Sequence, residues 1–401
     1  MLARLAHGWN VDEIAAALDR PANHVVPPSN ELTLDLLQRL ATTLEWTVAD
    51  VVDALGADSG RWITTEPNAP LDVVTDDFAA LDLEMGKAFR RGAYHDMIQL
   101  GEYAREIASS AEQRALVCNR LSGAWDGLGY YERARREARR GLEEPALPDD
   151  LRTMLASNLA NAHYTLWEPF EAQAIATSII DAAPTSTGTE PSLRDRRNVA
   201  WAQYVRGHSY RRLIALDPEQ ALIYARQAER DLSAAHDAWS QLAEEFDDHE
   251  GYRGIAHTCY GGLLEVKVTL GVHSAHEALH LLRREIDSLV TPDHDELAGA
   301  MLESCGWWCI FACNIATRAL DASARHDALS GFVASAWPIA ARLSNWALRE
   351  RVLTMEHTMN ADSPSSSRAM TPERVRLVVG AMGRFRAFRA TGWQMLQAHA
   401  G

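Results

Sequence analysis

Residues 116–142 read LVCNRLSGAWDGLGYYERARREARRGL, and residues 155–181 read LASNLANAHYTLWEPFEAQAIATSIID. Each stretch is predicted to form a pair of short helices. Small residues fall where the helices of a pair would cross: Gly129 and Ala134 in the first, Ala160 and Ala172 in the second. Bulky residues are expected to fill the space between turns: Trp125, Tyr130, Leu159, Tyr164 and Phe170. Together with the absence of convincing strand-like alternation, this pattern predicts an all-α protein.

The pattern recurs between about residues 85 and 290 with a period of about 34 residues, and so resembles the tetratricopeptide repeat. The resemblance implies an α-superhelix over residues 76–359 that binds a peptide or protein in a concave groove. After residue 200, helices such as 218–246 are longer than the repeat allows, so we expect the later units to be irregular.

Composition narrows the class of protein. A length of 401 residues leaves room for two or three domains, and a net charge of −16 argues against non-specific coating of nucleic acid. No apolar stretch approaches the ~20 residues that span a bilayer, and the N-terminus becomes acidic too soon for a secretory signal. The five cysteines do not suggest a disulfide framework. We therefore expect a cytoplasmic protein.

Residues 1–56 are predicted to form a compact helical domain. VDEIAAAL (11–18) and ELTLDLLQRLATTLEWTVADVVDAL (31–55) each carry apolar residues at helical spacing, and Thr47 with Asp50 has the form of a capping box. Both segments are similar to the phage-repressor-like (Xre-type) helix-turn-helix domain. That resemblance implies DNA binding and a role in transcription regulation.

The sequence departs from this family at the recognition helix. Only residues 19–31 are available there, and Pro27 and Pro28 would end any helix after about a turn and a half. Residues 1–56 hold three arginines against eight acids, whereas a DNA reader needs cations on phosphate. Arg20 and His24 are the candidate DNA contacts, with help from arginines elsewhere. The alternative is a degenerate module kept for dimerisation or docking.

Two linkers and a basic C-terminal helix complete the expected organisation. Residues 57–75 and 360–372 are predicted linkers. Pro372 suits the first turn of a helix over 373–399, within a C-terminal segment that ends at 401. Six arginines against one acid make residues 368–401 basic: Arg368, Arg374, Arg376, Arg384, Arg386 and Arg389.

A metal site is one alternative function. His276, Glu277 and His280 form the pattern H-E-x-x-H, which on a helix can bind zinc. The surrounding residues faintly resemble bacterial metallopeptidases fused to Xre-type domains, which would need Glu296 or Glu303 as the third ligand. The other interpretation is structural, because such sites usually lie beside a strand and none is predicted.

Cysteines recur every four residues at Cys305, Cys309 and Cys313, so one helical face would carry all three. Metal-binding cysteines more often lie two residues apart on turns, and free cysteine behaves as a small buried hydrophobe. A buried stripe is the favoured interpretation, with a metal or redox site as the alternative.

The predicted groove carries the candidate partner-binding residues, because the first helix of each tetratricopeptide repeat lines the concave face. Asparagine and arginine side chains placed there can hold the backbone or carboxylate of an extended peptide. Three successive repeats contribute Asn119, Arg120 and Asp126; Asn158, Asn161 and Tyr164; and Tyr204, His208 and Arg211.

The sequence thus favours a regulatory protein, expected to be a homodimer, that binds a peptide or protein and possesses no catalytic residues or cofactor. One alternative is a repeat scaffold or adaptor without a DNA role. The second is a zinc peptidase that uses His276, His280 and Glu296.

We predict that the protein purified without added metal carries no stoichiometric zinc, and that Glu277→Gln loses little stability. Elemental analysis and thermal unfolding measure the two quantities. One zinc per chain, absent from His276→Ala or His280→Ala, would instead support the peptidase.

Overall fold

The computed structural model describes residues 10–25, 33–44, 48, 51–52, 75–183, 191–246, 250–290, 299–361 and 371–397. Within these ranges the protein is all-α and holds no strand, as predicted. The chain divides into two compact units: a smaller one from 1–70 with 369–401, and a larger one from 71–368.

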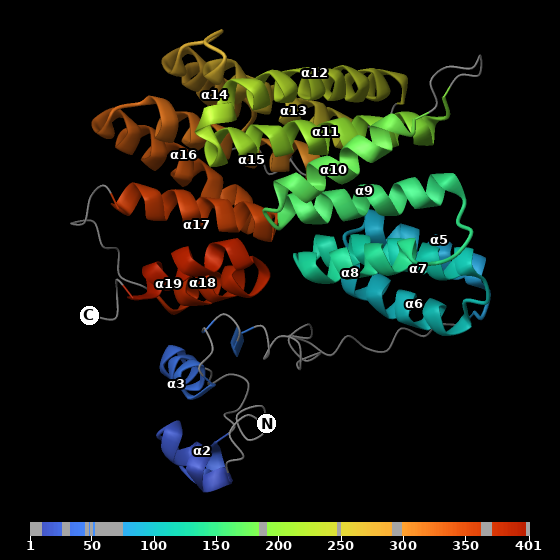
Figure 1. The fold of residues 1–401 in the computed structure, drawn as a ribbon, viewed down its shortest axis with the longest axis vertical. Coiled ribbons are helices and arrows are strands. Elements are labelled where there is room, and N and C mark those ends of the chain that lie inside the picture. Colours follow the sequence, from blue (N-terminus) through green and yellow to red (C-terminus); the bar gives the residue numbers. More distant parts are fainter. Residues whose placement is uncertain are drawn as a thin grey trace. The chain divides into compact units, whose positions relative to one another are not determined.

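The larger unit is a succession of helices in which each helix packs against its neighbours in the chain, an arrangement compatible with a repeat α-solenoid (Figure 1). The helices are α5 (Phe78–Arg90), α6 (Tyr94–Ile107), α7 (Ala111–Gly127), α8 (Tyr131–Leu142), α9 (Asp149–Thr165), α10 (Pro169–Asp181), α11 (Leu193–Leu216), α12 (Ala221–Glu245), α13 (Glu250–Thr269), α14 (Ala275–Leu289), α15 (Gly299–Ala319), α16 (Ala322–Arg342) and α17 (Trp346–Ala361). A 3₁₀ turn, η2 (Pro218–Gln220), precedes α12.

The two hairpins that the sequence predicts are α7–α8 and α9–α10. Ala134, Ala160 and Ala172 are buried at helix contacts as expected. Gly129 differs: it lies in the turn after α7 with φ of 78°, a left-handed conformation that glycine adopts without a steric penalty. Phe170 was wrongly predicted to fill the core, because it lies in the first turn of α10 and is 57% exposed.

Local signals explain where several helices begin. The side chain of Ser110 accepts a hydrogen bond from Gln113 N–H while the Gln113 side chain accepts from Ser110, which forms a capping box at the start of α7. Asp321 caps α16 through its carboxylate, so this helix starts at Ala322, earlier than the predicted break at 321–326.

Helices α11 and α12 run for 24 and 25 residues, which confirms that the later units exceed the repeat length.

The odd-numbered helices from α5 to α17 form a continuous row. Each of them contacts the next odd-numbered helix in addition to its neighbours in the chain. The last helix of the row returns to the first hairpins. The Ala347 N–H donates to the Tyr131 hydroxyl at 3.1 Å, and the Arg351 guanidinium lies 3.8 Å from the centre of the Trp167 ring. A Cβ on Gly129 would come within 2.6 Å of Trp346, so glycine permits this approach. The row therefore closes on itself.

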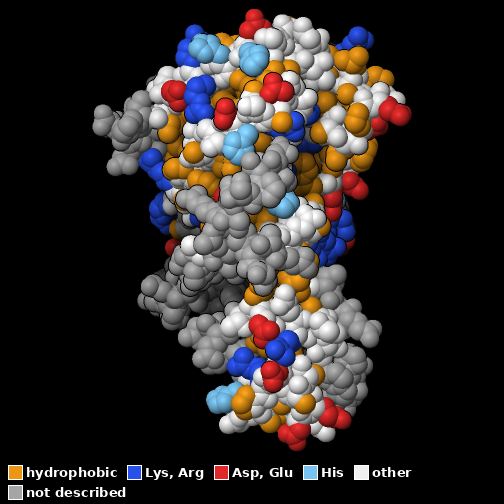
Figure 2. Space-filling view, turned by 90° about the vertical axis from the view of Figure 1, so that its left-hand side faces the viewer, with side chains coloured by type: hydrophobic (Ala, Val, Ile, Leu, Met, Phe, Trp, Pro, Cys, Tyr) orange, Lys and Arg blue, Asp and Glu red, His pale blue; other side chains and the backbone are white. Residues whose placement is uncertain are grey.

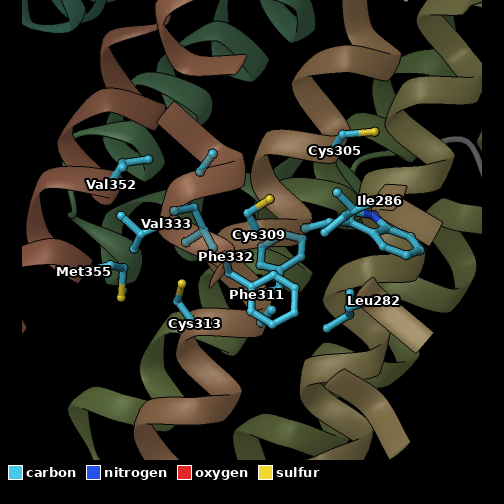
Figure 3. Packing of buried hydrophobic residues seen from close by; sticks show 14 of the residues in the cluster. Leu282, Ile286, Cys305, Cys309, Phe311, Cys313, Phe332, Val333, Val352 and Met355 are labelled. Atoms are coloured by element: carbon cyan, nitrogen blue, oxygen red, sulfur yellow. The ribbon is translucent and has the colours of Figure 1, made fainter. Parts of the chain in front are cut away.

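An extended hydrophobic cluster lies between α13, α14, α15, α16 and α17 (Figure 3). It contains Cys305, Cys309 and Cys313, all fully buried, together with Phe311 and Phe332. Burial raises the pKa of Cys305 and of Cys309 to about 12 and that of Cys313 well above its usual value, so the three remain thiols. The predicted buried cysteine stripe is confirmed.

In the smaller unit, the first helices are α2 (Val11–Ala17) and α3 (Leu34–Leu44), as predicted. A capping box between Asn10 and Glu13 starts α2. Between the two helices the structure describes one 3₁₀ turn, η1 (Ala22–His24), while residues 26–32 lie outside the described part. Val48, Val51 and Val52 are helical, whereas the predicted Thr47 cap and most of the 57–75 linker lie outside the described residues.

The C-terminal segment belongs to this same unit. It forms α18 (Pro372–Arg384), a 3₁₀ turn η4 (Arg386–Phe388) and α19 (Arg389–Gln397), so the prediction of one helix over 373–399 was wrong. The break falls at Phe385, whose backbone is extended (φ −127°, ψ 105°) while its side chain is fully buried. Phe388 in η4 is buried as well.

The surface of the described residues is that of a polar helical protein. Figure 2 shows charged side chains of both signs scattered among hydrophobic ones over one face of the larger unit. None of the helices described here is long and apolar enough to cross a membrane.

Close helix packing gives a test of the fold. We predict that Gly254→Ala in α13 lowers the free energy of unfolding by about 1–3 kcal/mol, because the new Cβ would lie 2.5 Å from the Ala300 carbonyl carbon. Gly251→Ala in the same helix is the control, since no described atom lies within 4 Å of its Cβ position. Urea denaturation compares the two, and equal stabilities would contradict the α13–α15 packing.

Candidate functional site

Polar side chains link neighbouring odd-numbered helices along the row. Between α5 and α7, the Arg120 guanidinium donates two hydrogen bonds to Asp82, at 2.8 and 2.9 Å. Between α7 and α9, Asn158 Nδ2 donates to Asn119 Oδ1 at 2.9 Å. All four side chains are half-buried, so they combine internal partners with access to solvent.

A second pair joins α7 and α9 one to two turns further along. Asn161 Nδ2 donates to Asp126 Oδ1 at 3.3 Å, and both residues are half-buried. Asn119, Asp126, Asn158 and Asn161 therefore occupy one interhelix seam. The structure brings these four predicted residues together in pairs.

The predicted residues of α11 lie deeper. His208 and Arg211 are buried, at 1% and 4% exposure, and so is Tyr164 of α9. Arg211 Nη2 donates to the Tyr164 hydroxyl at 3.4 Å, and Arg211 Nε donates to His208 Nδ1 at 3.1 Å. The half-buried Tyr204 ring packs edge-on against His208 with centroids 4.5 Å apart. These four residues form one contiguous group.

The protonation of His208 follows from its surroundings. Burial, with the nearby charges of Arg211 and Arg212, holds the pKa of His208 well below its usual value, so the imidazole is neutral. Because Nδ1 accepts from Arg211, the ring proton resides on Nε2. Among the described residues Nε2 has no hydrogen-bond partner.

Glu265 of α13 is the partner of Arg211 and lies at the centre of the larger unit. Its carboxylate is 1% exposed and accepts from Arg211 Nη1 at 2.7 Å. Two side chains of α15 donate to the same carboxylate: Arg318 Nη2 at 2.5 Å and Asn314 Nδ2 at 3.2 Å. One buried acid thereby joins α11, α13 and α15.

Glu303 continues the row from α15 to α17. It accepts hydrogen bonds from Trp307 Nε1 at 3.2 Å and from Asn345 Nδ2 at 2.9 Å. Asn345 in turn accepts from the Leu348 N–H at 2.9 Å and so caps the start of α17. Burial raises the pKa of Glu303 above its usual value.

Asp126 and Glu303 come from distant parts of the chain but lie near each other. Burial raises the pKa of Asp126 to about 7, and the neighbouring Glu303 carboxylate contributes to the rise. Burial and the charges of these two acids also raise the pKa of the Tyr94 hydroxyl. We call Asp126, Glu303, Tyr94 and Asn161 the carboxyl cluster.

Asparagine amides, tyrosine hydroxyls and half-buried carboxyls offer donors and acceptors that match a peptide backbone or an amine. One arrangement of catalytic type occurs elsewhere: His257 Nδ1 lies 2.8 Å from Ser304 Oγ, and His257 Nε2 lies 3.6 Å from Glu285. Ser304 is fully buried, however, so a substrate cannot reach its hydroxyl.

The H-E-x-x-H residues lie on α14. Both histidines are exposed, while Glu277 accepts from the Ser274 N–H and hydroxyl at 2.9 Å and forms the capping box of the helix. These hydrogen bonds lower the pKa of Glu277. Glu296 lies outside the described residues, and within the described ranges no group of three histidine, cysteine or acidic side chains could hold a metal ion.

The candidate DNA contacts Arg20 and His24 lie beside each other in the smaller unit. The Arg20 Nε donates to the His24 carbonyl at 2.9 Å, which holds the η1 turn together. His24 is exposed and Arg20 is half-buried. Whether they contact DNA stays a prediction.

Sequence reasoning missed Glu265, and it considered Glu303 only as a zinc ligand. Glu265 could have been found from the sequence. It is a lone acid within the apolar run GGLLEVKV, and an acid is rarely buried without a partner. Nothing local in the sequence marks Glu303 as a neighbour of Asp126.

No protein-family model matches the sequence, and no curated protein is similar to it.

The carboxyl cluster generates a pH prediction. Unfolding restores the Asp126 pKa to about 4, so between about pH 4 and pH 7 the folded protein binds more protons than the unfolded one. The free energy of unfolding should fall as pH rises through this window, by up to about 1.4 kcal/mol per pH unit from this group. Urea denaturation at several pH values should show a shallower fall for Asp126→Asn. An unchanged pH dependence in this variant would contradict the raised pKa.

Proposed function

We propose that this protein is a ligand-responsive regulator. In this proposal a tetratricopeptide-type solenoid binds an extended peptide, either free or as part of a protein, along its odd-numbered helices. The helix-turn-helix-like unit at the chain ends then provides a transcription-regulatory output. The observation that carries the proposal is the unbroken row of odd-numbered helices, lined by half-buried amide and carboxyl groups that come from successive hairpins.

The chemistry of the seam between α7 and α9 supports a peptide ligand. Asn119, Asn158 and Asn161 each carry one acceptor and two donor hydrogens, of which the internal contacts use only part. An extended peptide presents alternating N–H and C=O groups that such amides can pair with. Asp126 and Tyr94 add an acidic and a phenolic group at one end of this seam.

The predicted groove residues differ in how deeply they are buried, and we assign them different roles on that basis. Tyr164, His208 and Arg211 are engaged inside the larger unit, so we assign them to positioning the helices. Arg120 is held by two hydrogen bonds to Asp82, and a ligand carboxylate would have to displace that acid. Direct contacts are therefore assigned to the half-buried asparagines and to the carboxyl cluster.

The contact between the last helix of the row and the first hairpins allows ligand binding to affect the packing of that helix. Helix α17 contacts the first residue of α8, just after the turn that follows α7, and Glu303 holds the cap of α17 while lying near Asp126. A ligand that contacts Asp126 and Asn161 would alter the hydrogen bonds on both sides of this closure. A binding event at the first hairpins would then change the packing of the last helix.

Peptide selection tests the proposal. A library of random synthetic peptides is selected on the immobilised full-length protein, and the best peptide is labelled and titrated by fluorescence anisotropy. We predict that Asn161→Ala or Asn158→Ala weakens its affinity about tenfold, a loss of about 1.4 kcal/mol. Thermal unfolding should change by no more than about 2–4 °C.

Gln227→Ala is the matched control, since Gln227 is a half-buried amide on the even-numbered helix α12. Its affinity for the same peptide should equal that of the unchanged protein. Failure to select any peptide, or equal losses in all three variants, would refute the assignment of the binding face to the odd-numbered helices.

A further inference from the structure

We propose that the two ends of the chain form one composite DNA-binding surface, in which arginines of the C-terminal helices supply the phosphate contacts that the N-terminal helices lack. This inference rests on the proposed regulatory function and names where its output contacts DNA. It is carried by the packing of the smaller unit and by the distribution of charge between its two segments.

The two segments share a hydrophobic core. Trp393 of α19 packs against the cluster formed by Leu37 and Ala41 of α3 with Val48 and Val51. A Cβ added to Gly383 of α18 would lie 3.2 Å from Val52, so the C-terminal helices approach this cluster at two points. On its other face α3 contacts α2, through Leu36 against Ile14 and Leu18. The C-terminal segment therefore completes the fold of the helix-turn-helix-like region.

Charge is distributed unevenly between the segments. Residues 1–70 hold four arginines against ten acids, whereas residues 369–401 hold five arginines against one acid. Together the two segments give the smaller unit a net charge of −2, whereas the whole chain carries −16. The larger unit therefore carries most of the negative charge and would repel a polyanion. The C-terminal arginines are therefore assigned most of the phosphate contacts.

Three of these arginines surround the turn between α18 and α19. Arg386 lies in η4 and is exposed, while Arg384 and Arg389 are half-buried on either side of it. The Arg384 Nη1 donates to the Gly380 carbonyl at 3.1 Å, and the Arg389 Nε donates to the Met382 carbonyl at 3.2 Å. These bonds use one nitrogen of each guanidinium, and the sequence places all three cations within six residues. Duplex DNA, with its dense phosphate charge, is the partner that such a group fits.

Arg374 differs from these three. It lies in the first turn of α18, and burial lowers its pKa to about 10. We therefore leave it out of the proposed contact set. The predicted Arg20 remains compatible with a contribution from the N-terminal segment, because its charge lies in the same unit.

The salt dependence of DNA binding tests the inference with the full-length protein. The probes are a labelled duplex of the region upstream of its own gene and a random-sequence duplex. Arg384→Gln/Arg386→Gln/Arg389→Gln should weaken binding to both duplexes. It should also reduce the slope of log affinity against log salt concentration by roughly 1 for each phosphate that the variant no longer neutralises.

Arg386→Gln alone, at an exposed position, gives a variant in which the fold is expected to stay intact and the slope should fall by roughly 1. The control is Arg90→Gln/Arg226→Gln/Arg230→Gln, which removes three exposed arginines from the larger unit. This control should leave the slope unchanged, and thermal unfolding is recorded for every variant.

The outcomes separate the two proposals. Full-length protein that binds DNA with a slope unaffected by the C-terminal substitutions would overturn the composite surface but not the regulatory function. Substitutions that lower the melting temperature without changing the slope would assign the arginines to internal charge compensation and also overturn it. No binding to either duplex at low salt would overturn the DNA-binding output as a whole.

Discussion

The buried carboxylate of Glu265 is the contact on which the larger unit depends. Removing a charge from water costs several kcal/mol unless it is paired and hydrogen-bonded, and Glu265 meets both conditions through Arg211, Arg318 and Asn314. Since these partners come from α11 and α15 while Glu265 lies on α13, no one of the three helices can slide or rotate without exposing an unpaired charge. Hydrophobic packing alone would tolerate small displacements, whereas this network defines the register of the helices.

Polar pairing extends along the row in both directions from this acid. Toward the start of the solenoid, Arg211 reaches Tyr164, and the paired asparagines and Asp126 join α9 to α7. Toward its end, Glu303 fixes the cap of α17, which returns to the start of α8. The arginines at Glu265 donate charged hydrogen bonds of 2.5 and 2.7 Å, whereas uncharged amides join α9 to α7 through bonds of 2.9 and 3.3 Å. Because amide donors are uncharged, a ligand can replace the bonds of the α7–α9 seam more readily than those of Glu265.

The sequence was informative wherever a signal is local. Small residues opposite bulky ones predicted the α7–α8 and α9–α10 hairpins, and four-residue spacing predicted the buried cysteine face of α15. The sequence could not predict which polar side chains pair inside the larger unit. Arg211 and Glu265 lie 54 positions apart and meet only once α11 and α13 have packed. Phe170 shows the limit of residue type as evidence, since an aromatic in the first turn of α10 faces solvent. The break at Phe385 was missed, because apolar residues continue at helical spacing on both sides of it.

The discontinuous smaller unit has a consequence for synthesis on the ribosome. Trp393 packs against Leu37 and Ala41 but is synthesised after the whole of the larger unit, about 350 residues later. At about 5–20 residues per second, roughly 18–70 s separate the two events. During that interval the nascent helices lack part of their core, while the solenoid between them can already fold. A chain that stopped between the larger unit and Trp393 would lack the residues that complete the core of the smaller unit.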